Sequence, residues 1–201
     1  NMVALVDQRP RVLNLKDFLE QFILHRREVV TRRTQFELRQ ARARAHILEG
    51  LAVALANVDP IIELIKASAT PDEAQTALTS KLWKSELVAE MVARADVDFL
   101  RPDGVGPEYC WQPADKAYRL TDVQAKAILE MRLQRLTAME SDKVIAEYKE
   151  VIETVRDLLD ILAKPERVTK IIATELTDIK KQFGDGRKSE IVLNAEETSI
   201  E

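Results

Sequence analysis

The sequence has few of the residues that interrupt helices. Among its 201 residues there are only five glycines and seven prolines, and aromatic side chains make up 5%. Leu, Ala, Glu, Lys and Arg dominate instead, as they do in long helices. With 46% apolar residues, the chain has enough material for one substantial core or two smaller ones. The composition therefore predicts an all-α fold class.

The chain has a single cysteine, Cys110, and no long apolar run. One cysteine excludes an intramolecular disulfide and a multi-cysteine zinc site, and it fits a reducing cytosol. We interpret Cys110 as a buried, unreactive thiol. No basic segment followed by an apolar stretch opens the sequence, as a signal peptide would, and no stretch approaches the roughly 20 apolar residues that span a bilayer. We therefore expect a cytoplasmic protein with no membrane partner.

A net charge of −4 gives no global electrostatic case for nucleic-acid binding, so any DNA contact has to come from a local patch. One stretch concentrates seven arginines: Arg26, Arg27, Arg32, Arg33, Arg39, Arg42 and Arg44. They could form a solvated flank that pairs with residues 121–201, which carry 17 acidic and 13 basic side chains. They could equally form a positive wall that contacts DNA phosphates without sequence preference. Composition leaves both interpretations open.

The longest predicted element is a helix over residues 14–57. Asn14 is a suitable N-cap, no proline follows before Asn57, and Gly50 costs a helix only about 1 kcal/mol. Apolar residues repeat with the coiled-coil period along this run. They form two series: Phe22, Val29, Phe36 and Ala43 at spacings of seven, then Leu38, Ala41, Ala45, Leu48, Ala52 and Leu55 at alternating spacings of three and four.

A second apolar stripe occupies residues 139–183. Its members are Val144, Tyr148, Val151, Val155, Leu158 and Leu162, at spacings of four and three. Pro165 then suits the first turn of a further helix that ends near Phe183. Two such helices, separated by about 80 residues, bury their stripes against each other only when antiparallel, with the intervening segment folded at their far end. The pattern predicts a long antiparallel coiled-coil arm with a helical globular tip.

The segments at either end of the arm have their own signals. Residues 1–13 alternate like a strand, a turn and a strand, which predicts a short β segment at the N-terminal base and a chain that begins inside a larger fold. In the tip, helices are predicted to begin at Asp59-Pro60, at Thr70-Pro71 and at the capping box Thr121–Gln124. The last of these is expected to reach Leu136. Residues 82–94 are predicted to be another helix and residues 96–117 a loop.

Sequence motifs for catalysis are missing. His25 and His46 lie 21 residues apart on one predicted helix, a separation of roughly 30 Å, so they cannot share a metal ion. There is no glycine-rich phosphate loop, no G-x-S-x-G elbow and no H-E-x-x-H pair. We therefore assign no catalytic residue and no metal ligand from the sequence.

Three blocks of sequence resemble the A subunit of bacterial DNA gyrase, a type IIA DNA topoisomerase. HRREVVTRRTQFELRQARARAHILEGLAVALANVDPIIELIKAS (25–68) resembles its long arm helix, and YRLTDVQAKAILEMRLQRLTAMESDKV (118–144) the segment that leads back from the tip. QFGDGRKSEI (182–191) is similar to the point where the arm rejoins the body. The VVTRRT wording and an insertion around residues 83–117 favour gyrase over topoisomerase IV. The segment 79–117 fits the family least well.

The resemblance implies a division of the chain into segments with different roles. It gives a β segment at the base (1–13), an outgoing coiled-coil helix (14–57), a tip with the C-gate dimer interface (58–138), returning coiled-coil helices (139–183) and an exit segment (184–201). In this family the C-gate holds the dimer together while a DNA duplex leaves the enzyme. The DNA-cleaving tyrosine lies upstream of the matching region, so this fragment alone is not expected to be an enzyme.

The resemblance also implies partners and cofactors. The expected partners are a second copy of the same polypeptide bound through the tip, the B subunit of gyrase and double-stranded DNA. The parent complex uses ATP and Mg²⁺ through the B subunit, so no cofactor is expected in this fragment. For the dimer interface we predict outward residues of the tip, namely Leu120, Gln124, Ile128, Met131, Arg132, Arg135 and Leu136. Ile128, Met131 and Leu136 could equally fill the core of the tip itself.

Two other interpretations of the sequence stay open. The chain could be an unrelated antiparallel coiled-coil scaffold, which would dimerise along its arms instead of at its tip. It could also be a helical enzyme whose site the sequence hides, in which case a concave pocket with clustered titratable groups is expected.

Overall fold

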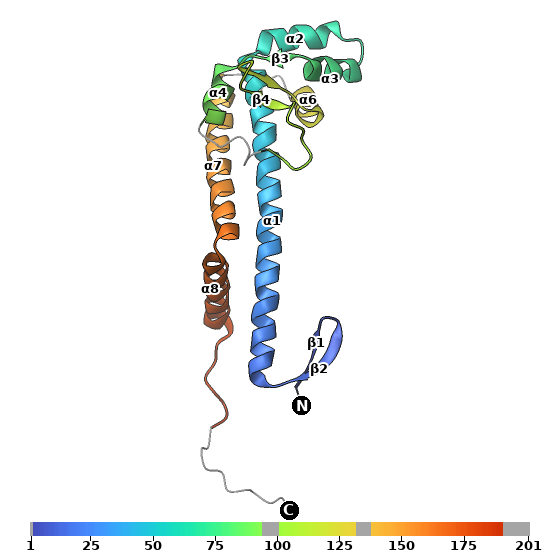
Figure 1. Cartoon of the computed structure of the whole chain (residues 1–201). Coiled ribbons are helices and arrows are strands. Elements are labelled where there is room, and N and C mark those ends of the chain that lie inside the picture. Colours follow the sequence, from blue (N-terminus) through green and yellow to red (C-terminus); the bar gives the residue numbers. More distant parts are fainter. Residues whose placement is uncertain (1, 94–100, 132–137, 191–201) are drawn as a thin grey trace, which may run out of the picture. The chain divides into compact units, whose positions relative to one another are not determined.

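The computed structural model describes residues 2–93, 101–131 and 138–190. The described chain is mostly helical and falls into two compact units, one formed by Asn1–Val30 and Glu166–Glu201 and the other by Thr31–Pro165. One helix, α1 (Leu15–Ala56), contributes its beginning to the first unit and the rest to the second (Figure 1). The division into segments with separate roles stays a prediction.

The first unit begins with an antiparallel hairpin of β1 (Met2–Val6) and β2 (Arg9–Leu13). Asp7 and Gln8 form its two-residue turn, with positive φ values of 50° and 64°. Two left-handed residues in succession match the right-handed twist of hairpin strands. The predicted β segment is therefore confirmed. Pro10 lies within β2, which has no partner on its other side in the described sheet and so tolerates a missing N–H.

The first unit also contains the beginning of α1 and all but the first residue of α8 (Pro165–Phe183). Asn14 caps α1, because its side-chain oxygen accepts a hydrogen bond from the backbone N–H of Asp17 at 2.8 Å. The Arg26 guanidinium donates a hydrogen bond to the Glu175 carboxylate of α8. The predicted proline start and the predicted end of α8 are both confirmed.

In the second unit, α1 and α7 (Ala138–Ala163) lie side by side and run in opposite directions (Figure 1). Their buried side chains belong to one hydrophobic core. Buried positions on α1 include Thr34, Leu38, Ala45, Leu48 and Ala52, and those on α7 include Tyr148, Ile152, Val155 and Leu158. The antiparallel pairing predicted from the two stripes is thus present in this unit. The coiled-coil arm as a whole stays a prediction.

The earlier apolar series on α1 is not the buried one. Phe22 and Phe36 are 42% and 55% exposed, whereas Leu38 is only 6% exposed. Two residues along an α-helix correspond to a rotation of about 200°, so Phe36 and Leu38 cannot face the same partner. The series through Leu38 continues back to the buried Thr34 at a spacing of four. This series forms the seam, that is, the buried stripe of α1. The described chain therefore buries the series through Leu38 and leaves Phe22 and Phe36 exposed.

We call the elements of the second unit between α1 and α7 the head. Its first two helices are α2 (Val58–Ala67) and α3 (Pro71–Ser80). The Oγ of Thr70 accepts a hydrogen bond from the backbone N–H of Glu73 at 3.2 Å, which confirms the predicted cap of α3. The start of α2 was predicted two residues too late, since its N-cap position is Asn57 and not Asp59.

A third head helix, α6 (Asp122–Leu129), begins with the predicted capping box. The Thr121 hydroxyl faces the backbone N–H of Gln124, while the Gln124 side-chain oxygen accepts from the backbone N–H of Thr121 at 3.0 Å. The helix ends at Leu129 instead of continuing to Leu136. Residues 132–137 lie outside the described residues, so the rest of that prediction is not addressed.

A small sheet completes the head and corrects two predictions. Its strands lie in the order β3 (Leu82–Trp83), β5 (Ala117–Arg119) and β4 (Cys110–Gln112), all antiparallel. Residues 82 and 83 were predicted to be helical, but α4 spans only Glu86–Ala93. Residues 110–112 were predicted to be loop. Strands of two or three residues are too short to show an alternating pattern, so β5 and its partners gave no signal.

The fold class is therefore mostly helical with an N-terminal β hairpin, as predicted, together with a second small sheet that was not. None of the helices described in residues 2–93, 101–131 and 138–190 combines the length and the apolar character that a membrane crossing requires.

Candidate functional site

The head contains a buried cluster of polar side chains centred on Glu49 of α1. Both carboxylate oxygens of Glu49 accept hydrogen bonds, one from the Tyr118 hydroxyl at 2.6 Å and one from the Tyr148 hydroxyl at 2.9 Å. Glu49 is only 6% exposed, and this burial raises the pKa of its carboxyl to about 7 against the opposing effect of the two tyrosine hydrogen bonds. Near neutral pH the group is therefore poised between its two protonation states.

His46 lies one helical turn before Glu49 and is also buried. Its Nε2 is 2.7 Å from the Thr121 hydroxyl, at the cap of α6. Burial lowers the pKa of His46 to about 4, so the imidazole is neutral at physiological pH. An Nε2–H that donates to Thr121 leaves the other ring nitrogen, Nδ1, without a proton.

Gln124 of α6 joins the two halves of the cluster. Its side-chain amide donates to the backbone carbonyl of His46 at 2.6 Å and to the Tyr118 hydroxyl at 2.8 Å. Gln124 is fully buried, and it packs directly on Gly50, where a Cβ atom would lie 2.8 Å from the Gln124 Cβ. Glycine is therefore required at this point of α1 by close packing.

Cys110 completes the cluster from β4. Its Sγ lies 3.7 Å from His46 Nδ1, and its backbone has a φ of 68°, a left-handed value that non-glycine residues rarely adopt. Burial, with a further contribution from the Glu49 charge, raises the pKa of the thiol to about 11. The neutral thiol is a poor nucleophile, so the cluster does not have the activated cysteine of a Cys–His enzyme.

The sequence did not predict that His46, Glu49 and Cys110 lie together. The only local signal is the spacing of three between His46 and Glu49, which places both on one face of α1. The prediction that Cys110 is buried is confirmed.

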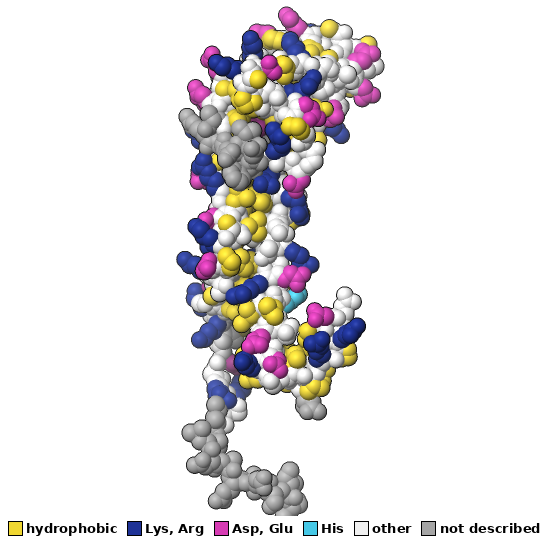
Figure 2. Space-filling model, in the orientation of Figure 1, with side chains coloured by type: hydrophobic (Ala, Val, Ile, Leu, Met, Phe, Trp, Pro, Cys, Tyr) yellow, Lys and Arg dark blue, Asp and Glu magenta, His cyan; other side chains and the backbone are white. Residues whose placement is uncertain are grey.

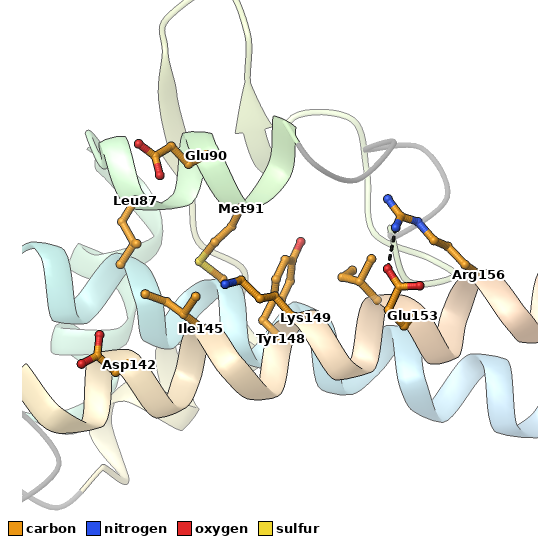
Figure 3. Close-up of a pocket in the computed structure, with 10 residues that line it drawn as sticks. Leu87, Glu90, Met91, Asp142, Ile145, Tyr148, Lys149, Glu153 and Arg156 are labelled. Atoms are coloured by element: carbon orange, nitrogen blue, oxygen red, sulfur yellow. Dashed lines mark hydrogen bonds and ion pairs between the residues drawn. The ribbon is translucent and has the colours of Figure 1, made fainter.

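A groove lies between α4 and α7 in the second unit (Figure 3). It has a volume of about 430 Å³ and combines apolar side chains such as Met91 and Ile145 with charged ones such as Lys149. Within its lining, Glu153 and Arg156 form an ion pair at 2.6 Å. Tyr148 also lines the groove, and its hydroxyl reaches through to Glu49. The groove is thus the outer side of the wall that encloses the polar cluster.

The arginine stretch is partly occupied with ion pairs. Arg26 pairs with Glu175 of α8 in the first unit, and Arg44 pairs with Glu147 of α7 at 2.6 Å in the second. The hydrogen bond that Arg44 donates to the Glu147 carboxylate raises the pKa of Arg44 despite partial burial. Arg27, Arg33 and Arg42 also have polar partners, namely Thr169, Glu37 and Asp103 respectively.

These contacts fit the flank interpretation for Arg26 and Arg44. On the face of the second unit seen in Figure 2, basic and acidic side chains are interspersed. Arg32 and Arg39 are exposed on α1. A DNA-facing role for the stretch stays a prediction.

Among the tip residues predicted for a dimer interface, three of the four that the structure describes are buried. Leu120 and Gln124 are 0% exposed and Ile128 is 3% exposed. Leu120 and Ile128 belong to the chain's own hydrophobic core, as the alternative interpretation of Ile128 allowed, and Gln124 is buried as well. Where the dimer interface lies stays a prediction. Met131 is half-buried, and Arg132, Arg135 and Leu136 lie outside the described residues. The outward apolar residue of α6 is Val123, which is 61% exposed.

The chain is mostly helical, and its antiparallel helix pair carries a head, which matches the expectation from the three sequence blocks. Comparison with known proteins identifies the class of protein. The sequence model of the family that comprises the A subunits of DNA gyrase and topoisomerase IV matches residues 1–177, and the chain belongs to this family.

Several A subunits of DNA gyrase are similar to this chain. The DNA gyrase A subunit of Pseudomonas aeruginosa is 52% identical over 200 residues, which cover 100% of this chain and 22% of that protein. The Escherichia coli protein of the same name is 51% identical over 201 residues (100% and 23%). That of Streptococcus pneumoniae is 39% identical over 193 residues (96% and 19%). The chain thus spans less than a quarter of the length of these relatives.

Proposed function

We propose that this chain is the coiled-coil and C-gate region of the A subunit of a DNA gyrase. In that role it holds two such polypeptides together and encloses the exit cavity for a transported DNA duplex during ATP-dependent negative supercoiling. The observation that supports the proposal is the match to gyrase A subunits along the whole chain. The antiparallel pair of α1 and α7, with a head built between them, is the architecture that such a gate needs.

When both DNA strands are cut, only protein contacts hold the two halves of the enzyme together. A dimer contact far from the cut therefore prevents a double-strand break. The contact has to open repeatedly, which favours an interface of standard size over an obligate dimer core. The helices that carry it have to be stiff, and a continuous buried seam on α1 and α7 supplies stiffness.

The chemistry belongs elsewhere in the longer protein. In this proposal the fragment itself is not an enzyme, and the DNA-cleaving tyrosine, the B subunit, ATP and Mg²⁺ are provided by other parts of a cytoplasmic complex. The fragment contributes the gate and encloses double-stranded DNA without cutting it.

The dimer interface is assigned to the outward side of the head. Leu120, Gln124 and Ile128 are buried within the chain itself. We therefore propose Val123, which is exposed on α6, as the interface residue. A carboxylate at this position would have to be desolvated in a dimer, at a cost of several kcal/mol if unpaired.

Light scattering over a concentration series tests the proposal. We expect the chain to dimerise and Val123→Glu to shift it towards the monomer. The matched control is Phe36→Glu, which places the same charge on another exposed apolar residue, on α1. Loss of the dimer in Phe36→Glu alone would indicate association along the helices, as in a general coiled-coil scaffold. A monomer at every concentration would argue against an autonomous gate.

A further inference from the structure

Three side chains with metal-binding atoms meet in the head, although they come from distant parts of the sequence. His46 and Glu49 belong to α1 and Cys110 to β4. Their ligand atoms all lie within 4.8 Å of one another, and all three residues are buried. We propose that His46, Glu49 and Cys110 bind one divalent transition-metal ion, and that Zn²⁺ best matches this set of nitrogen, oxygen and sulfur ligands.

The distances are close to those of a zinc site. With Zn–S of about 2.3 Å and Zn–N of about 2.0–2.1 Å, tetrahedral geometry separates the sulfur and the nitrogen by about 3.6 Å. Cys110 Sγ and His46 Nδ1 are 3.7 Å apart. No pair in the cluster exceeds 4.8 Å, so the Glu49 carboxylate needs to move by about 1.5 Å at most to complete the set.

The hydrogen bonds around His46 leave Nδ1 free to act as a ligand. Nε2 is engaged by Thr121 at 2.7 Å, and such a partner on the second nitrogen is the usual way in which a ligand histidine is oriented. The Gln124 amide lies 3.2 Å from Nδ1, but it has only two hydrogens. Its two shorter contacts, to the His46 carbonyl oxygen at 2.6 Å and to Tyr118 at 2.8 Å, use both of them.

Glu49 also keeps room for an ion. An ionised carboxylate accepts about four hydrogen bonds, two at each oxygen. Tyr118 and Tyr148 use one position on each oxygen, which leaves a position on each for a metal. The two hydroxyls would then hold the liganding carboxylate in place.

Coordination also balances the charges. The Cys110 thiol would lose its proton to solvent as its sulfur binds the metal, and Glu49 would bind as a carboxylate. Together with a neutral imidazole, these two negative charges neutralise a divalent ion. Arg101 lines the same cavity, and its buried Nε–H has no acceptor in the part of the chain that the structure describes. A thiolate in that cavity is a better acceptor for this donor than a thiol.

The cavity limits what can bind. It measures about 10 Å³ and is lined by the three ligand residues together with Arg101 and apolar neighbours. This volume holds one ion or one water molecule and is too small for a phosphate or a nucleotide.

Cobalt titration tests the proposal directly. The chain is stripped with a chelator, freed of the chelator and titrated with Co²⁺, whose bond to a thiolate produces a charge-transfer band in the near ultraviolet. We expect one Co²⁺ per chain, this band, and its loss when Zn²⁺ is added. Cys110→Ser should abolish the band. His25→Gln, at an exposed histidine on the same helix, should leave it unchanged.

A second variant keeps the test decisive if Cys110→Ser folds poorly by circular dichroism. Glu49→Gln should retain the thiolate band at saturation while weakening Co²⁺ binding at least ~10-fold. Cobalt uptake without a thiolate band, or a band that survives in folded Cys110→Ser, would mean that the metal binds elsewhere and would overturn the proposal. Unchanged affinity in Glu49→Gln, or no uptake at millimolar Co²⁺, would overturn it as well.

Discussion

Substitutions of Glu49 and His46 should change the pH dependence of folding stability in opposite directions. The experiment uses Glu49→Gln and His46→Gln, with a chelator present so that no metal occupies the cluster. Glutamine removes the titrating group in each case and keeps a polar side chain. The two variants therefore separate the contributions of two buried groups that lie one helical turn apart.

The directions follow from the pKa values. Folded Glu49, with a pKa of about 7 against 4.5 for an unperturbed carboxyl, keeps a proton that the unfolded chain has released. Its favourable contribution is complete below about pH 4.5 and is lost as the pH rises through 7. Folded His46, with a pKa of about 4 against 6.5, stays neutral where the unfolded chain is protonated. Its contribution is complete above about pH 6.5 and is lost as the pH falls through 4.

The two effects are similar in size and opposite in sign. Each pKa displacement corresponds to roughly 3 kcal/mol. Between about pH 4.5 and 6.5 the folded chain holds its proton on Glu49 and the unfolded chain holds one on the histidine, so the two effects nearly cancel. We therefore expect this pair to contribute little to the pH dependence of the free energy of unfolding of the unsubstituted chain in this range. Glu49→Gln should become more stable as the pH rises from 4 to 6.5, and His46→Gln less stable as it rises from 4.5 to 7.

Urea unfolding at a series of pH values measures these slopes. The quantity to compare is the free energy of unfolding of each variant minus that of the unsubstituted chain, because the other titrating groups are common to both. Difference curves that do not change with pH would refute the reasoning. Curves of the same sign for both variants would show that the assigned protonation states are wrong.

Three further predictions concern packing and DNA. Gly50→Ala should destabilise the chain by about 1–3 kcal/mol in thermal or urea unfolding, because the new Cβ would lie 2.8 Å from the Gln124 Cβ; unchanged or higher stability would contradict this. Leu48→Ala, at 0% exposure, should cost about 2–5 kcal/mol. Phe36→Ala, at 55% exposure, should cost less than about 0.5 kcal/mol, and equal costs would contradict the assigned seam. If the arginine stretch faces DNA, Arg39→Gln should reduce the slope of log K against log salt for duplex binding by roughly 0.9, whereas no duplex binding at low salt would leave the stretch a solvated flank.

The features that the sequence predicted are those determined by neighbours along the chain. The caps at Asn14, Thr70 and Thr121 depend on hydrogen bonds to residues three positions away, and all three are present. The choice between two apolar series on α1 was different. It depends on which side the partner helix covers, and Phe36 fits a heptad as well as Leu38 does.

The polar cluster could not be predicted for the same physical reason. Cys110 lies 64 residues from His46, and their contact depends on a strand too short to leave a pattern. Gln124 has the sequence signature of a capping residue, and it does cap α6. That signature does not reveal that the same side chain also donates to α1 and β5. Long-range pairing determines those bonds.

The cluster also bears on how a gate could keep its geometry. An apolar seam is non-directional, so α1 and α7 held by the seam alone could exchange one register for another at modest cost. Hydrogen bonds are directional, and a buried donor or acceptor that loses its partner costs about 1–3 kcal/mol. The Glu49 carboxylate bonds to Tyr118 of β5 and to Tyr148 of α7, so a slip of either element leaves buried polar groups unpaired. We therefore interpret Glu49 as the point where the register of the helix pair and the position of the head are fixed together.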